Sequence, residues 1–348
     1  MKKSLLALAV LSSFAVGAQA QSSVTVYGVV DMALQHQDLG NKAGSTTALD
    51  SGIQGGSRLG FKGSEDLGGG LKANFQLEMG INADTGASAQ GRTFGRQSFV
   101  GLSGDFGAVN FGRQYSPLFI AVDSFDPFGT GITSGTAGVG TSGYGAAHFF
   151  VPGNPRIDNS ISYSSNSMSG FAVNAIYGMG TETPGNSSAG RYMDLSGTYT
   201  AGPLFAELVY TDSKNAAGNN STKSLLAAGT YNFGVATVHA AFQTVEDDGA
   251  AAVAVDRQVM SIGVTVPVGA GAIIANYIDF SNKNSLIKSA DASQLAVGYT
   301  YSLSKRTNLY TSLSRTENEA NSAMGSDGGG AIIGKNVKMF NVGIRHKF

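Results

Sequence analysis

The sequence of 348 residues contains no cysteine and no tryptophan, and it has only four histidines. The lack of cysteine excludes disulfide bonds and metal sites built on thiolates, so a secreted chain of this size must gain its stability elsewhere. Charged residues make up 14 % of the chain and the formal net charge is −1. This balance argues against a general nucleic-acid-binding protein.

Long apolar runs are also missing, because no segment approaches the roughly 18 consecutive apolar residues that mark a transmembrane helix. At the N-terminus, Lys2 and Lys3 precede an apolar stretch over 5–18 that is too short to span a bilayer. Residues 18–20 read Ala-Gln-Ala, a typical cleavage pattern. We therefore expect residues 1–20 to be a secretory signal peptide rather than a membrane anchor, and residues 21–348 to form one domain.

Common enzyme signatures are absent from the sequence, among them the G-x-S-x-G elbow, the H-E-x-x-H helix and the Walker loop. Residues 138–143 match G-x-G-x-x-G, but they lie in a glycine-rich stretch without the strand and helix that a nucleotide site requires. His239 stands without a partnered serine and carboxylate. We expect no enzymatic activity, no cofactor and no metal site.

The sequence is rich in a strict alternation of apolar and polar residues. The pattern is clearest over 336–348, and it recurs over 70–80 and 294–301. In the C-terminal segment, Phe340, Val342 and Ile344 share one face, while the residues between them are polar or small. A period of two predicts β-strands with one apolar and one polar face.

Short and long connections alternate along the chain. The predicted tight turns are 65–70, 103–107, 164–170, 200–203, 232–234, 267–271 and 302–306, and the predicted long polar connections are 35–56, 81–94, 114–155, 179–190, 212–222, 245–256, 281–292 and 316–335. These connections separate sixteen strands, an even number that leaves both termini on the periplasmic side. The sequence thus predicts an all-β fold, a 16-stranded antiparallel transmembrane β-barrel.

A soluble β-sandwich would alternate in the same way. However, the chain has 49 glycines, and the strands carry small residues on both faces, which pack a dry core poorly. A closed barrel satisfies its backbone within lipid, faces the membrane with its apolar side and has a polar lumen. The expected lumen residues are Arg58, Lys62, Lys72, Asn74, Gln76, Glu78, Arg96, Arg156, Asp158 and Asn174.

The longest connection, 114–155, contains two carboxylates, Asp123 and Asp126. A loop of this length is usually functional. If it folds into the lumen, its carboxylates face the inward arginines of the wall, and opposite charges across a narrow passage create a transverse field that filters solutes. The arginines expected there are Arg58, Arg96 and Arg156.

Arg113 has an unusual position in the alternating pattern. It falls on the same face of its strand as Val109 and Phe111, which should face outward. An arginine that faces lipid at the middle of the bilayer costs about 2–4 kcal/mol in a barrel. That cost disappears if another subunit covers the face and supplies a carboxylate. Alternatively, Arg113 lies among lipid headgroups, or a β-bulge reverses its direction.

Several segments together resemble the trimeric general porins of Gram-negative outer membranes, in particular the betaproteobacterial and neisserial branch. The resemblance rests on residues 24–34, 57–78, 95–117, 123–129, 156–171 and 342–348. It implies a sixteen-stranded barrel in the bacterial outer membrane, a homotrimer, and a third loop folded inward to form an eyelet. It also implies contacts with outer-membrane lipid and lipopolysaccharide.

The resemblance also implies roles for those positions of this sequence that match the family pattern. Arginines of the eyelet (Arg58, Arg96, Arg156) would face the loop carboxylates Asp123 and Asp126, and Arg113 would lie toward the trimer interface. Phe348 would be the terminal aromatic residue that the barrel-assembly machinery reads. The expected function is passive, weakly charge-selective diffusion of small hydrophilic solutes and ions. A substrate-selective channel for anions or sugars is the alternative.

Overall fold

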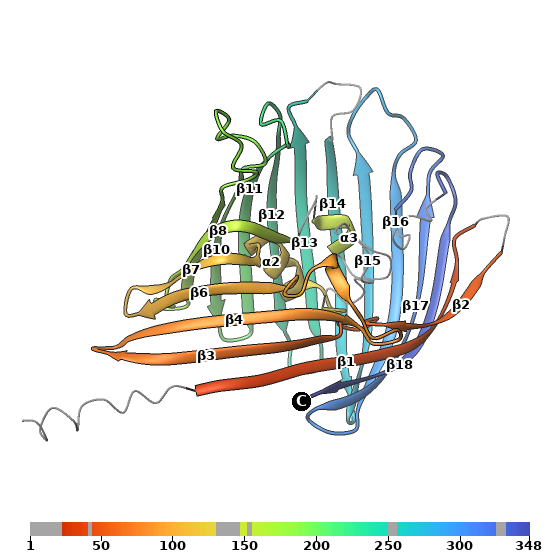
Figure 1. Ribbon diagram of the computed structural model, residues 1–348. Coiled ribbons are helices and arrows are strands. Elements are labelled where there is room, and N and C mark those ends of the chain that lie inside the picture. The colour runs from red at the N-terminus through yellow and green to blue at the C-terminus, as the bar shows by residue number, and fades with distance from the viewer. Residues whose placement is uncertain (1–22, 41–43, 130–146, 152–154, 250–255, 325–331) are drawn as a thin grey trace, which may run out of the picture.

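The computed structural model describes residues 23–40, 44–129, 147–151, 155–249, 256–324 and 332–348 (Figure 1). The expected signal peptide and the 138–143 glycine motif lie outside these residues. The elements are β1 Ser23–Asp38, β2 Thr46–Ser51, β3 Arg58–Gly68, β4 Leu71–Asn82, β5 Ala87–Ser88, the 3₁₀ helix η1 Ala89–Gly91, β6 Gln97–Gly104, β7 Gly107–Tyr115, α2 Pro117–Phe125, α3 Ala147–Phe150, β8 Arg156–Ser164, β9 Phe171–Gly178, β10 Tyr192–Ala201, β11 Leu204–Lys214, β12 Ser221–Asn232, β13 Thr237–Asp247, β14 Asp256–Val268, β15 Gly271–Asn282, β16 Ala292–Ser302, β17 Thr307–Asn318 and β18 Val337–Lys347.

The strands form one closed antiparallel sheet. Each wall strand pairs with its neighbour in sequence, and β1 closes the ring by pairing with β18. β1 pairs with β2 over one half and with β3 over the other, so β2 and β3 together make a single wall strand. β5 pairs only with the end of β4. The eighteen strand segments therefore make the sixteen wall strands that the sequence predicts.

All seven predicted tight turns join adjacent wall strands. The predicted connection 35–56 was wrong in its extent, because β1 continues to Asp38 and β2 occupies Thr46–Ser51. The polar residues of this segment suggested a loop. However, β1 and β2 continue their antiparallel pairing beyond the apolar part of the strand. Other strands also run a few residues into the predicted loops, as β11 does to Lys214.

The outer surface of the barrel is apolar. Large apolar side chains on the outward positions are widely exposed, including Val24, Val26, Val100, Phe111, Leu208, Ile262 and Leu313. Buried polar side chains occupy the inward positions, including Gln35, Gln243, Gln294 and Asn341. This polarity is the reverse of a soluble protein and matches a barrel with lipid outside and water inside. Within the described residues, no helix has the length and apolar character that a membrane-crossing helix requires.

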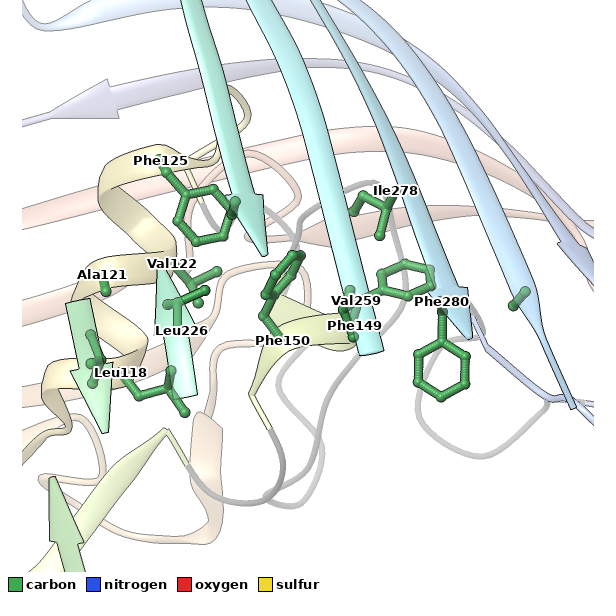
Figure 2. Close-up of a cluster of buried hydrophobic side chains, with 13 residues drawn as sticks. Leu118, Ala121, Val122, Phe125, Phe149, Phe150, Leu226, Val259, Ile278 and Phe280 are labelled. Carbon is green, nitrogen blue, oxygen red and sulfur yellow. The ribbon is translucent and has the colours of Figure 1, made fainter. Parts of the chain in front are cut away.

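The third loop folds into the barrel through helix α2, as predicted. Ser116 caps the helix, because its Oγ accepts a hydrogen bond from the Phe119 N–H at 3.1 Å, and Pro117 occupies the first turn. One face of α2 packs against the inside of the wall (Figure 2). The buried cluster contains Leu118, Ala121, Val122, Phe125, Phe149, Phe150, Val209, Leu226, Ala241, Val259, Ile278, Phe280 and Ala292.

The wall also holds both ends of α2. At the N-terminal end, the Leu118 N–H donates to Oδ2 of Asp194 at 3.0 Å. At the C-terminal end, Nδ1 of His239 lies 2.8 Å from the Phe125 carbonyl oxygen, to which it can only donate. A carboxylate at the N-terminus and an imidazole donor at the C-terminus both complement the helix dipole. The opposite face of the helix, with Ile120 and Asp123, stays exposed.

Candidate functional site

Tyr115 joins two of the predicted eyelet arginines to the inward loop. It is the last residue of β7, and its Oη accepts hydrogen bonds from Arg96 Nη2 at 2.7 Å and from Arg156 Nη2 at 2.9 Å. Its ring stacks on Phe119 of α2, with ring centroids 4.9 Å apart. Arg96 immediately precedes β6 and Arg156 begins β8. The short separation of these strand ends around the wall brings the two guanidinium groups together.

Glu78 supplies the carboxylate that contacts the arginines most closely. Its Oε1 lies 2.7 Å from Arg96 Nε and 3.9 Å from Arg58 Nη1, and its Oε2 accepts a hydrogen bond from Tyr27 at 2.9 Å. The side chains of Arg96 and Glu78 are 6 % and 5 % exposed, so this pair is shielded from bulk water. The sequence predicted Glu78 only as a general lumen residue. Its direct contact with the cluster depends on the register of β4 against β3.

Four of the five predicted eyelet residues line one cavity of about 170 Å³. They are Arg58, Arg96, Arg156 and, from α2, Asp123. Asp126 is absent from this lining, because its carboxylate is turned into the loop, where it accepts a hydrogen bond from the Phe128 N–H at 3.0 Å. It is 4 % exposed. The lining residues that the sequence did not predict include Gly55, Gly56 and Tyr115.

Further basic side chains lie on the same side of the lumen. Lys62 follows Arg58 on the inward face of β3, and its Nζ lies 5.2 Å from the centre of the Tyr27 ring. Lys72 is exposed near the β3–β4 turn. Arg345 donates through Nε to Asn308 at 3.1 Å, and Lys347 shares its face of β18. The alternation over 336–348 already put Arg345 on the polar face, but its proximity to Arg58 depends on barrel closure.

Arg113 lies on the outer face, as its parity predicts. It pairs in register with Ser98, while Phe111 pairs with Val100, and both of these apolar residues are exposed. The carboxylate that faces Arg113 comes from the same chain, since Asp158 Oδ1 lies 2.6 Å from its Nη1. Asp158 also accepts from Arg92 at 2.8 Å. The expectation that Asp158 faces the lumen was therefore wrong, and the irregular register between β7 and β8 at 112–114 explains why.

Phe348 lies at the seam where the barrel closes. Its backbone N–H donates to the Gly28 carbonyl oxygen, and its own carbonyl accepts from the Gly28 N–H, both at 3.1 Å. Its ring covers Gly28 so closely that a Cβ there would collide with it. The terminal residue thus contributes to the junction of the first and last strands.

Comparison with known proteins agrees with this architecture. The profile of the Gram-negative porin family matches residues 7–321 of the chain. The chain belongs to this family. It is an outer-membrane porin, which forms a water-filled channel for the passive diffusion of small hydrophilic solutes.

Two relatives match this porin along its whole length. Outer membrane porin protein 32 of Delftia acidovorans is 35 % identical over 365 residues, with 100 % of both chains covered. An outer membrane porin protein of Bordetella pertussis is 32 % identical over 413 residues, again with 100 % of both covered. The solved structure of an anion-selective porin from Comamonas acidovorans is 32 % identical, covers 94 % of this chain and 100 % of its own, and superposes with a TM-score of 0.79.

Proposed function

We propose that this porin is a trimeric diffusion channel without catalytic activity, and that it prefers anions. The proposed eyelet consists of Arg58, Arg96 and Arg156 on the wall, with Asp123 on the facing helix. The convergence of the three guanidinium groups on one cavity carries this proposal.

Charge counting favours anions at this point of the lumen. Three arginines share the cavity and its rim with two carboxylates, Glu78 and Asp123, so the local balance is positive. Lys62, Arg345 and Lys347 extend the basic surface along the wall. A unit charge about 4 Å from a permeant anion contributes about 1 kcal/mol even in water, which is about a five-fold enrichment. The anion-selective porin from Comamonas acidovorans, which shares this fold at 32 % identity, agrees with this direction.

Replacing two eyelet arginines tests the assignment. In the double variant Arg58→Gln/Arg96→Gln, we expect the anion-to-cation permeability ratio to fall several-fold, because two fixed positive charges leave the narrowest region. The ratio is measured from the reversal potential of single channels in planar bilayers under a salt gradient.

The matched control removes two positive charges from the outer face, in the double variant Arg315→Gln/Lys338→Gln. These residues pair in register on β17 and β18, and Arg315 is bound to Glu317 at 2.9 Å. The control should keep the reversal potential of the unaltered porin. Equal reversal potentials for the eyelet variant and the unaltered porin would reject the eyelet assignment.

The outer ionic cluster of Arg92, Arg113 and Asp158 supports a subunit interface. Its position on the outward surface would otherwise expose charge to lipid, which is unfavourable in a barrel. We expect Arg113→Ala to lower the temperature at which the trimer dissociates, as observed on gels of unheated and progressively heated samples. An unchanged trimer band at every temperature would contradict a role of Arg113 in assembly.

The remaining parts of the proposal concern export and membrane insertion. Residues 1–20 would direct export and be removed, and Phe348 would engage the barrel-assembly machinery during insertion. Outer-membrane lipid and lipopolysaccharide would cover the apolar outer surface. Mass spectrometry of the purified porin tests the first point, since the mature chain should begin at Gln21.

A further inference from the structure

A six-residue segment interrupts the wall strand formed by β2 and β3. Met32 of β1 pairs with Ser51 of β2, and Val29 pairs with Arg58 of β3. Only two residues of β1 separate these pairings, whereas the opposite strand contains Gly52–Ser57 between them. The chain leaves the strand at Gly52, which has φ of +79°, a left-handed conformation that glycine adopts without strain. The surplus residues therefore leave the plane of the sheet.

Asp31 fixes the path of this segment. The carboxylate is 0 % exposed, and its Oδ2 accepts hydrogen bonds from the backbone N–H groups of Gln54 at 2.8 Å and Gly55 at 2.6 Å. Its Oδ1 accepts a hydrogen bond from the Tyr310 hydroxyl. Because a buried carboxylate is stable only with such donors, Asp31 and the backbone of the segment hold each other in place.

The segment contacts the inward loop as well as the wall. Ile53 is 1 % exposed and lies in a cluster with Ala33, Ala296 and Tyr310. Phe128, just beyond α2, packs against this cluster. The Gln54 Oε1 accepts a hydrogen bond from Asn308 Nδ2 at 2.7 Å. These contacts place the segment between the barrel wall and the third loop.

Gly55 and Gly56 of the segment line the same cavity as the eyelet arginines and Asp123. A Cβ on Gly55 would lie 3.4 Å from Arg345 Nη1 and 4.0 Å from Arg58 Nη2. Any larger side chain would project among these guanidinium groups. Glycine therefore keeps both the bore and the positive charges accessible.

We propose that Gly52–Ser57 is a second constriction element, that Gly55 determines the size limit of the passage, and that Asp31 is its positioning residue. The proposal rests on the eyelet proposed above. It adds a second boundary of the passage, which belongs to the wall strand and not to the third loop. The size of solute that passes should thus depend on Gly55 as well as on α2.

The absence of cysteine from the chain allows a direct test. In the variant Gly55→Cys, the negatively charged reagent methanethiosulfonate ethylsulfonate should cause a stepwise loss of single-channel conductance and a shift of the reversal potential toward cations. The positively charged ethylammonium reagent should also reduce conductance but shift the potential toward anions. Labelling is verified by mass spectrometry.

The matched control is Gly197→Cys. Gly197 faces outward on β10, and a Cβ there meets no atom within 4 Å. The same reagents should leave its conductance unchanged. If Gly55→Cys does not insert, Gly56→Cys serves the same purpose. Labelling without a change in conductance, or no labelling by these small water-soluble reagents, would overturn the placement of the segment in the passage.

Variants of Asp31 test the positioning role. Asp31→Ala should raise the size cut-off for neutral polyethylene glycols in solute-exclusion measurements and weaken the reagent effect at Gly55→Cys. Asp31→Asn keeps an acceptor oxygen, so its size cut-off and its reagent effect at Gly55→Cys should lie close to those with Asp31 intact. Equal size cut-offs for Asp31→Ala and the unaltered porin would reject the positioning role of Asp31. Because the Arg58→Gln/Arg96→Gln measurement is independent, a failure here is distinguishable from a failure of the eyelet itself.

Discussion

At the scale of single residues, the proposed eyelet depends on how its charges are paired as well as on their number. Arg96 and Glu78 form a shielded ion pair, whereas Asp123 lies on the exposed face of α2. The wall carboxylate offsets part of the positive charge of the arginines and holds Arg96 in one orientation. Neutralising an arginine and neutralising Glu78 should therefore have opposite effects on ion preference.

Glu78→Gln provides the residue-scale prediction. The amide keeps the size of the side chain and removes one negative charge beside Arg96, so we expect a stronger preference for anions. Reversal potentials of single channels in a salt gradient measure the change, which should be opposite in sign to that of the Arg58→Gln/Arg96→Gln variant. Glu317→Gln, on the outer face, is the control, and a shift toward cations in Glu78→Gln would contradict the charge balance proposed here.

The alternation of apolar and polar residues predicted the direction of many side chains, but not of all of them. Arg58, Arg96 and Arg156 meet in one cavity, as predicted, because strands that are adjacent in sequence are adjacent in the wall. Asp126 and Asp158 were assigned from their loop position and their parity alone. Asp126 turns into its own loop, and one extra residue in β8, over 157–160 opposite Gly112–Gln114 of β7, carries Asp158 to the outer face.

At the scale of elements, α2 owes its position to the wall more than to its own helix propensity. A helix of nine residues is too short to be stable alone in water. Its buried face lies in an apolar cluster on the inside of the wall, and Asp194 and His239 bind its two ends. Helix α2 is thus held against the wall at both ends and along its buried face.

Removing part of this apolar contact should loosen the loop. Phe125 is 0 % exposed and packs edge-on against Phe150. We expect Phe125→Ala to weaken the attachment by about 3–5 kcal/mol, the usual range for a buried phenylalanine. The measurable result is greater noise in the open-channel current and a larger mean conductance.

Ile120→Ala is the matched control for Phe125→Ala. Ile120 lies on the same helix and is 52 % exposed, so its truncation removes a side chain without leaving a cavity behind α2. Its current noise should stay at the level of the unaltered porin. If Phe125→Ala is equally quiet, the loop is held by its hydrogen bonds alone.

At the scale of the whole molecule, the barrel depends on joining its first and last strands. Ten residue pairs connect β1 with β18, from Val29 with Lys347 to Asp38 with Lys338. Beyond this ladder, the Phe348 ring covers Gly28 on the outer face. The terminal aromatic residue therefore stabilises the closed ring itself, in addition to its proposed role in assembly.

The variant Gly28→Val should weaken the seam. Its side chain would displace the Phe348 ring and press on the Arg58 carbonyl, and such overpacking typically costs about 1–3 kcal/mol. We expect the folded form to convert to the unfolded form at a lower temperature, as followed by the shift in gel mobility on heating. Gly197→Val, in open space on the outer face, should convert at the temperature of the unaltered porin, and the same conversion temperature for Gly28→Val would refute this prediction.

The sequence by itself determined the strand number, the apolar outer face, the polar lumen and the inward direction of Arg58, Arg96 and Arg156. These properties follow from a period of two and from the alternation of short and long connections, which are local features of the chain. The tertiary structure alone decided that Glu78 pairs with Arg96, that Gly55 reaches the passage and that Arg345 lies beside Arg58. Those contacts depend on strand register and on closure between β1 and β18, which join residues far apart in sequence and leave no local periodic signal.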